Sequence, residues 1–124
     1  MKRDGAEEDG DRMDRAHARL AMAVAGFAVG VAPRALAEEG RGATAVTFGR
    51  QVAMYLCHVV FELSLARVAV AFARDRSTVG HACHVIEERR DDPAFDGWIG
   101  ALECARQETP QPRDWTASMR RRSL

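Results

Sequence analysis

A two-residue interruption between two amphipathic segments constrains the fold of this chain more than any other feature. After residues 73–74, the apolar side chains Val79, Cys83 and Ile86 repeat at helical spacing and form one stripe. Before the interruption, residues 65–72 carry apolar side chains at three- and four-residue spacing. Two short helices joined by so few residues must cross steeply, so the sequence predicts a helix-turn-helix within a small, all-α domain.

Both predicted helices begin at a residue that suits an N-cap. Ser64 can cap the first helix, and the Asp75 carboxylate can accept an N–H from Ser77 or Thr78 at the positive end of the second helix. On the second helix, the residues opposite the apolar stripe are Arg76, Ser77, Gly80, His81 and His84.

This polar face has the chemistry of a helix that reads DNA. Arg76 can donate a forked pair of hydrogen bonds to guanine O6 and N7, and Asp75 can accept one from cytosine N4. Ser77 and Thr78 can bind a base edge or a phosphate, while the histidines further along can touch a phosphate or the groove wall. The alternative interpretation is that the first residues only cap the helix and that the histidines are solvated surface.

Three separate strings of the sequence resemble the C-terminal DNA-binding domain of the chromosomal replication initiator DnaA. They are Arg50-Gln-Val-Ala-Met-Tyr-Leu56, Ser64-Leu65, and Phe72-Ala-Arg-Asp-Arg-Ser-Thr-Val-Gly-His-Ala-Cys83. The resemblance extends over roughly residues 20–104. It implies an all-helical domain that recognises short DnaA-box sequences in double-stranded DNA.

The resemblance also implies roles for individual residues. It assigns base contacts to Asp75, Arg76 and Ser77, and contacts with the DNA backbone or minor groove to Arg41, Arg50, Gln51, Thr78 and His81; the position of His84 adds it to the second group. The chain departs from the family pattern at four places: a turn one residue shorter, Arg76 for the usual His, Gly80 for a larger apolar residue, and Val85 for a basic one. The changes at Arg76 and Val85 bear on the identity of the bound sequence and not on the mode of binding.

The 124 residues have room for one domain. We expect a disordered leader over residues 1–16, the DnaA-like domain over residues 17–104 and a flexible basic tail over residues 105–124. Within the domain, we expect helices over about 20–32, 33–39 and 48–63, then the helix-turn-helix pair and a last helix over about 94–103, whose aromatic residues close the core. The first of these segments also imitates a signal peptide, although its acidic flank favours a buried helix.

The net charge of +0 is an objection to DNA binding, because affinity for DNA comes largely from neutralised phosphates. The distribution of charge weakens this objection, since arginines surround the predicted docking face while acidic residues gather at the leader and at the far end of the recognition helix. We therefore expect modest affinity with a shallow salt dependence. The arginines are Arg41, Arg50, Arg67, Arg74 and Arg76, and the acidic residues include Asp4, Glu7, Glu8, Asp9, Glu87, Glu88, Asp91 and Asp92.

Several other functions find little support. No Gly-x-x-x-x-Gly-Lys-Ser/Thr loop is present, so the sequence predicts no bound nucleotide and resembles the DNA-reading part of an initiator without its ATPase. Cys57-His58 and the His81, Cys83 and His84 group raise a zinc hypothesis, but both helix histidines face away from Cys83. No nucleophile can be placed beside the histidines, so we expect neither an enzyme nor a cofactor.

The sequence predicts a cytoplasmic, nucleoid-associated protein that binds double-stranded DNA and no membrane, with reduced thiols. Its effect would come from occupying sites that regulate replication initiation or transcription. One alternative is a protein-interaction module that kept the fold but lost its DNA sites. A third possibility is an exported or metal-binding protein, which would be cut near Glu38 or carry zinc.

Overall fold

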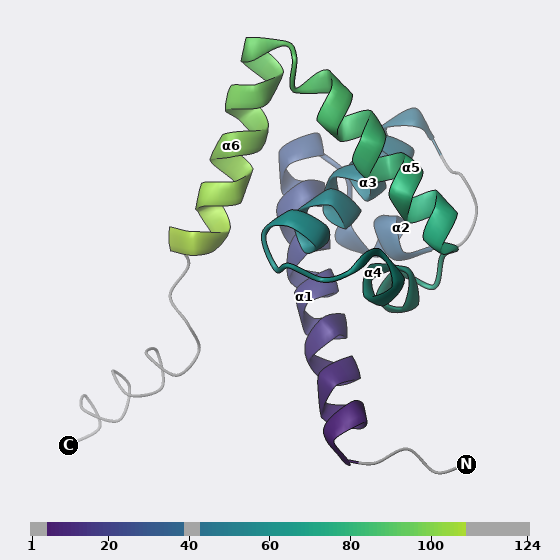
Figure 1. The fold of residues 1–124 in the computed structure, drawn as a ribbon. Coiled ribbons are helices and arrows are strands. Elements are labelled where there is room, and N and C mark those ends of the chain that lie inside the picture. Colours follow the sequence, from purple (N-terminus) through teal and green to yellow (C-terminus); the bar gives the residue numbers. More distant parts are fainter. Residues whose placement is uncertain (1–4, 39–42, 109–124) are drawn as a thin grey trace, which may run out of the picture.

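The computed structural model describes residues 5–38 and 43–108, and within these ranges every regular element is a helix (Figure 1). This confirms the all-α prediction. The helices, in chain order, are α1 (Gly5–Val29), α2 (Pro33–Ala37), α3 (Thr44–Val59), α4 (Leu65–Phe72), α5 (Arg76–Arg89) and α6 (Pro93–Glu108).

Helix α3 lies at the centre of the core and contacts α1, α2, α4 and α5. Six consecutive residues of α3, from Val52 to Cys57, are buried, so this part of the helix is covered on all sides. The recognition helix α5 packs against it through Val79, Ala82 and Ile86, which are likewise buried. A rigid central helix therefore supports the back of α5 and leaves its opposite face outward.

Helix α1 starts much earlier than the sequence indicated. The composition predicts that residues 1–16 are disordered or only transiently helical, whereas α1 begins at Gly5 and its N-terminal half projects beyond the other helices (Figure 1). A contact with α4 holds one turn of this segment: Arg67 binds the Asp14 carboxylate with both Nε, at 3.0 Å, and Nη2, at 2.6 Å. Asp14 is buried in this contact. The ion pair therefore holds a turn of α1 that has no apolar stripe of its own.

The apolar stretch that imitates a signal peptide forms the buried face of α1, including Ala21 and Ala25. Gly30 ends the helix with φ +82°, and its N–H and that of Val31 both donate to the carbonyl of Gly26. Within residues 5–38 and 43–108, no helix combines the length and the apolar character needed to cross a bilayer.

The helix-turn-helix forms where the sequence predicts it. The Ser64 hydroxyl accepts a hydrogen bond from the Arg67 N–H, which confirms it as an N-cap. Helix α4 ends at Ala73, which adopts the left-handed conformation, with φ 53° and ψ 47°. Asp75 occupies the N-cap position of α5, but its side chain makes no capping hydrogen bond, so that part of the prediction is wrong.

Helix α6 runs longer than expected, to Glu108, and packs through a buried Ile99 and a set of half-buried rings. Trp98 stacks on Phe48 of α3, with ring centroids 5.9 Å apart, and also contacts Phe95. The Arg89 guanidinium lies over both phenylalanine rings, at 4.8 Å and 4.4 Å. These aromatic side chains are therefore engaged with one another and with the end of α5.

Candidate DNA interface

The first turns of α5 present polar side chains to solvent. Arg76, Ser77 and Thr78 are exposed, and His81 follows them on the same side of the helix. Val79 lies between them in the sequence but on the buried face, with 0% of its surface exposed. The two faces of α5 are thus divided as the helical spacing predicted.

Within the described residues, the side chains of Asp75, Arg76 and Ser77 make no hydrogen bond or ion pair. A guanidinium, a carboxylate and a hydroxyl are therefore held side by side at the start of a helix without a partner in the protein. Binding a new partner here would therefore break no side-chain contact that the protein already makes.

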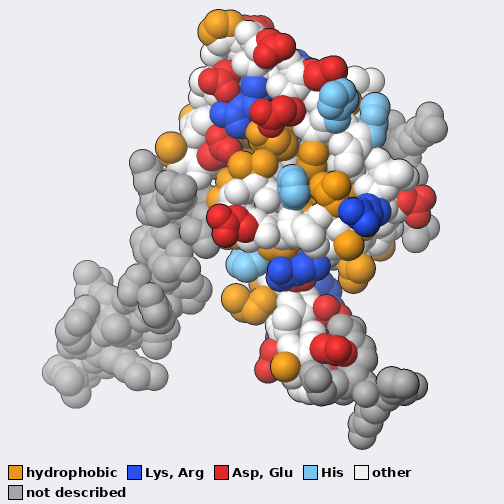
Figure 2. All heavy atoms as spheres, in the orientation of Figure 1, with side chains coloured by type: hydrophobic (Ala, Val, Ile, Leu, Met, Phe, Trp, Pro, Cys, Tyr) orange, Lys and Arg blue, Asp and Glu red, His pale blue; other side chains and the backbone are white. Residues whose placement is uncertain are grey.

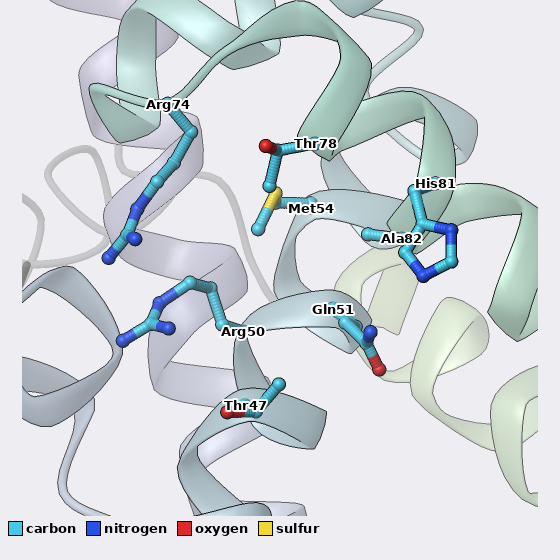
Figure 3. Close-up of a pocket in the computed structure, with 8 residues that line it drawn as sticks. All are labelled: Thr47, Arg50, Gln51, Met54, Arg74, Thr78, His81 and Ala82. Carbon is cyan, nitrogen blue, oxygen red and sulfur yellow. The ribbon is translucent and has the colours of Figure 1, made fainter. Parts of the chain in front are cut away.

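A pocket of about 480 Å³ lies between α3 and α5, beside these exposed residues (Figure 3). Thr47, Arg50 and Gln51 enter it from α3, and Thr78 and His81 from α5. Four residues that the sequence assigned to the DNA backbone are brought together here, although they come from segments about 30 positions apart. The lining of the pocket comprises Thr47, Arg50, Gln51, Met54, Arg74, Thr78, His81 and Ala82.

Arg50 is more buried than the sequence suggested. Only 5% of it is exposed, and its Nε donates to the Leu36 carbonyl at 2.9 Å. Its Nη2 contacts the carbonyls of Ala35 and Glu38 at 3.4 Å and 3.2 Å. Burial and the neighbouring positive charge of Arg74 lower the pKa of Arg50 from its ordinary value, although an arginine remains charged at neutral pH.

Arg74 is a pocket residue to which sequence reasoning gave no specific role. It follows the left-handed Ala73, and its Nη2 donates to the same Glu38 carbonyl that Arg50 contacts. The only sequence signal for Arg74 was its position in the turn. Its acceptor is a backbone carbonyl 36 positions away, and no pattern of side chains in the sequence predicts such a contact.

One predicted contact lies at the margin of this surface. His84 is exposed one turn beyond His81, and its Nε2 lies 3.1 Å from a carboxylate oxygen of Glu88. Arg41 lies outside the described residues. The pocket and the first turns of α5 therefore hold the described part of the predicted site, with His84 at its edge.

The far end of α5 has the opposite electrostatic character. Figure 2 shows acidic side chains gathered where α5 leads into α6, and Glu87, Glu88, Asp91 and Asp92 are exposed there. The Tyr55 hydroxyl donates to Glu87 at 2.7 Å and accepts from Arg90 at 2.9 Å. Burial, together with the hydrogen bond to Glu87, raises the pKa of Tyr55 to about 12.

Cys57 is buried and Cys83 is half-buried. Burial raises the pKa of Cys57 to about 12 and that of Cys83 to about 11, which disfavours both thiolates. Across residues 5–38 and 43–108, no three side chains of His, Cys, Asp or Glu are grouped closely enough to hold a metal ion.

Two helices joined by a short turn, the second of which packs on the core and presents an exposed polar face, define a helix-turn-helix protein. The chain belongs to the family described as the bacterial DnaA protein helix-turn-helix, whose model matches residues 20–86. The matched segment runs from the apolar part of α1 to Ile86 of α5 and so includes both helices of the motif. The family is one of helix-turn-helix domains rather than of catalytic domains.

Two relatives of this chain are chromosomal replication initiator proteins DnaA. The protein of Lachnoclostridium phytofermentans is 37% identical over 67 residues, which cover 52% of this chain and 15% of that protein. The Aquifex aeolicus protein is 45% identical over 56 residues, which cover 44% of this chain and 14% of that protein. The matched part of the chain therefore corresponds to about a seventh of each initiator's length.

Two solved structures share the fold. A DNA replication initiation factor superimposes with a TM-score of 0.70 at 29% identity, over 79% of this chain and 30% of that one. A replication initiator DnaA bound to AMPPCP and single-stranded DNA gives a TM-score of 0.67 at 28% identity, over 85% of this chain and 32% of that one. The arrangement of helices described above is thus shared with replication initiators.

Proposed function

We propose that this chain binds double-stranded DNA sequence-specifically, with the first turns of α5 in the major groove. The observation that carries the proposal is the exposed, unengaged set of Asp75, Arg76 and Ser77 at the start of the second helix of a helix-turn-helix. In that motif the N-terminal residues of the second helix meet base edges. Membership of the bacterial DnaA helix-turn-helix family supports the same orientation.

In this proposal the residues divide into two groups. Asp75, Arg76 and Ser77 contact bases, with the Arg76 guanidinium forked onto a guanine. Gln51, Thr78 and His81 line the adjoining pocket and contact the DNA backbone, which sets the register of the protein on the duplex. Arg41, which lies outside the described residues, reaches the neighbouring minor groove.

The bound sites are DnaA-box-like, and the chain acts by occupying them in the nucleoid. It either competes with or assists a replication initiator, or it regulates transcription from similar sites. A neutral chain with few phosphate contacts releases few counterions, so the salt dependence of binding is shallow. In a plot of log K against log salt concentration, each phosphate contact contributes a slope of about −0.9.

Selection of bound duplexes from a random pool tests this proposal, followed by anisotropy titrations of the selected duplex, its scrambled form and its single strands. We expect one enriched motif and at least about a thousandfold preference for it over scrambled DNA. Failure of folded protein to retard any duplex at low salt would contradict the proposal. That outcome would favour the interaction module that kept the fold and lost DNA binding.

A further inference from the structure

The end of α2 is held by two arginines that come from different parts of the chain. Arg50 of α3 donates to the carbonyls of Ala35, Leu36 and Glu38. Arg74, in the turn of the helix-turn-helix, also donates to the Glu38 carbonyl. Figure 3 shows the two guanidinium groups on the same side of the pocket. We refer to Arg50, Arg74 and these three carbonyls as the α2 clamp.

The α2 clamp solves a problem that a five-residue helix cannot solve alone. The last carbonyls of any helix lack partners within the helix and carry its negative end charge. Helix α2 has no side-chain capping bond at its start, and it ends at Glu38 in an extended conformation. Two guanidinium groups donate hydrogen bonds to these carbonyls. The negative end of the helix offsets the repulsion between the two positive charges.

The geometry of Arg50 fits this structural task better than a contact with DNA. Its side chain is buried, and its Nε and Nη2 are committed to backbone carbonyls. Gripping a phosphate with the forked edge would break these bonds and expose the end of α2. Gln51 and His81 line the same pocket with more exposed side chains, so they can reach a phosphate without such a cost.

We propose that the α2 clamp positions the start of the recognition helix, and that Arg50 is a positioning residue rather than a phosphate contact. Arg74 directly precedes Asp75 and Arg76, so a restraint on Arg74 is transmitted along two peptide units to the base-reading residues. Arg50 fixes the carbonyl to which Arg74 is tied. This role rests on the proposed function, because it assumes that the first turns of α5 meet DNA.

The discriminating variants are Arg50→Lys and Arg50→Ala, studied with the selected duplex at several salt concentrations and well below their melting temperatures. Lysine keeps the positive charge but cannot bind the three carbonyls as a fork. A positioning role predicts that both variants bind the selected duplex about tenfold more weakly, the scale of one lost base contact, with the wild-type salt slope. A phosphate contact predicts instead that Arg50→Lys binds nearly normally and that Arg50→Ala lowers the slope by about 0.9. That second pattern would overturn the inference.

Two measurements without DNA separate this inference from the proposed function. Backbone amide NMR shifts of residues 75–78 are expected to change in Arg50→Lys and to stay unchanged in Arg19→Ala, an exposed arginine on α1. In thermal unfolding, the effects of Arg50→Ala and Arg74→Ala are expected to be non-additive because the two side chains share one acceptor. Additive effects together with unchanged amide shifts would refute the clamp, whereas a wild-type protein that binds no duplex would refute only the proposed function.

Discussion

The two ends of α5 differ in what their polar side chains contact. At the start, Arg76 and Ser77 are exposed and, within the described residues, without a side-chain partner. At the far end, Glu87 and Arg90 both bind the Tyr55 hydroxyl of α3. The protein thus fixes one end of α5 with side-chain hydrogen bonds and leaves the polar groups at the other end exposed.

The two ends of α5 also differ in charge, because acidic residues gather at the far end. Asp91, Asp92 and their neighbours surround the anchored end, and Arg90 compensates for part of this charge by pairing with Asp96 at 2.5 Å and Glu103 at 3.1 Å. A DNA duplex laid along the whole of α5 would meet this acidic surface. The charge distribution therefore favours DNA docking at the start of α5, because the acidic far end repels phosphates.

The largest expected effect is a loss of stability on changing the buried face of α5, which runs between its two ends. Ile86 is fully buried against α3, so Ile86→Ala leaves a cavity in the core. We expect it to lower the free energy of unfolding by about 2–5 kcal/mol, measured by urea denaturation. Arg76→Ala, on the exposed face, should change the same quantity by less than about 0.5 kcal/mol. Similar losses in the two variants would remove the distinction between the faces.

The next effect is on DNA rather than on stability. Arg76→Ala should weaken binding of the selected duplex by about 1–3 kcal/mol and relax the preference at one base pair, because it removes a forked contact with a base. Competition titrations with duplexes changed at single positions measure both quantities. Arg19→Ala, which removes an exposed arginine from α1, is the charge-matched control. An equal loss for every duplex would show that Arg76 contacts phosphate and not a base.

Helical spacing was sufficient to predict the two faces of α5. The buried positions Val79, Ala82 and Ile86 and the exposed position Arg76 follow from a period of 3.6 residues, which depends only on local sequence. The DnaA resemblance implied the all-helical fold and pointed to four polar residues of the pocket, which are Arg50, Gln51, Thr78 and His81. Whether those residues touch DNA stays a prediction.

Contacts across long sequence separations could not be predicted in the same way. Arg67 and Asp14 lie 53 positions apart, and their ion pair ties an acidic segment of α1 to α4. The acceptors of Arg50 are backbone carbonyls, which every residue type provides, so no sequence pattern marks them. For this reason the sequence could not show that Arg50 is buried.

A smaller effect tests the anchored end alone. Tyr55→Phe removes the hydroxyl that joins Glu87 and Arg90, and we expect it to lower the free energy of unfolding by about 0.5–1.5 kcal/mol. Its affinity for the selected duplex should equal that of the wild type, because the start of α5 is untouched. Loss of DNA binding in this variant at a temperature where it is folded would show that the two ends are not independent.

Tyr55 also gives the anchored end a pH dependence. Its pKa is raised from 10.0 to about 12 in the folded protein, so the folded state holds this proton more tightly than the unfolded chain. Its contribution to stability is present below pH 10 and is lost as pH rises toward 12. Because Tyr55 is the only tyrosine, phenolate absorbance reports its titration directly. Tyr55→Phe should lose less stability than the wild type over this interval, and identical losses would contradict the assignment.

The smallest expected effect lies at the boundary between the two ends, where His84 pairs with Glu88 across one helical turn. Both side chains are exposed, so His84→Ala and Glu88→Gln should each cost only about 0.2–0.5 kcal/mol of stability. Their effects on DNA should differ. His84→Ala removes a backbone contact and weakens all duplexes alike, whereas Glu88→Gln removes a negative charge and frees the imidazole, so it should strengthen binding slightly. If Glu88→Gln weakens binding as much as His84→Ala does, the ion pair itself supports the helix, and the surface available to DNA ends before His84.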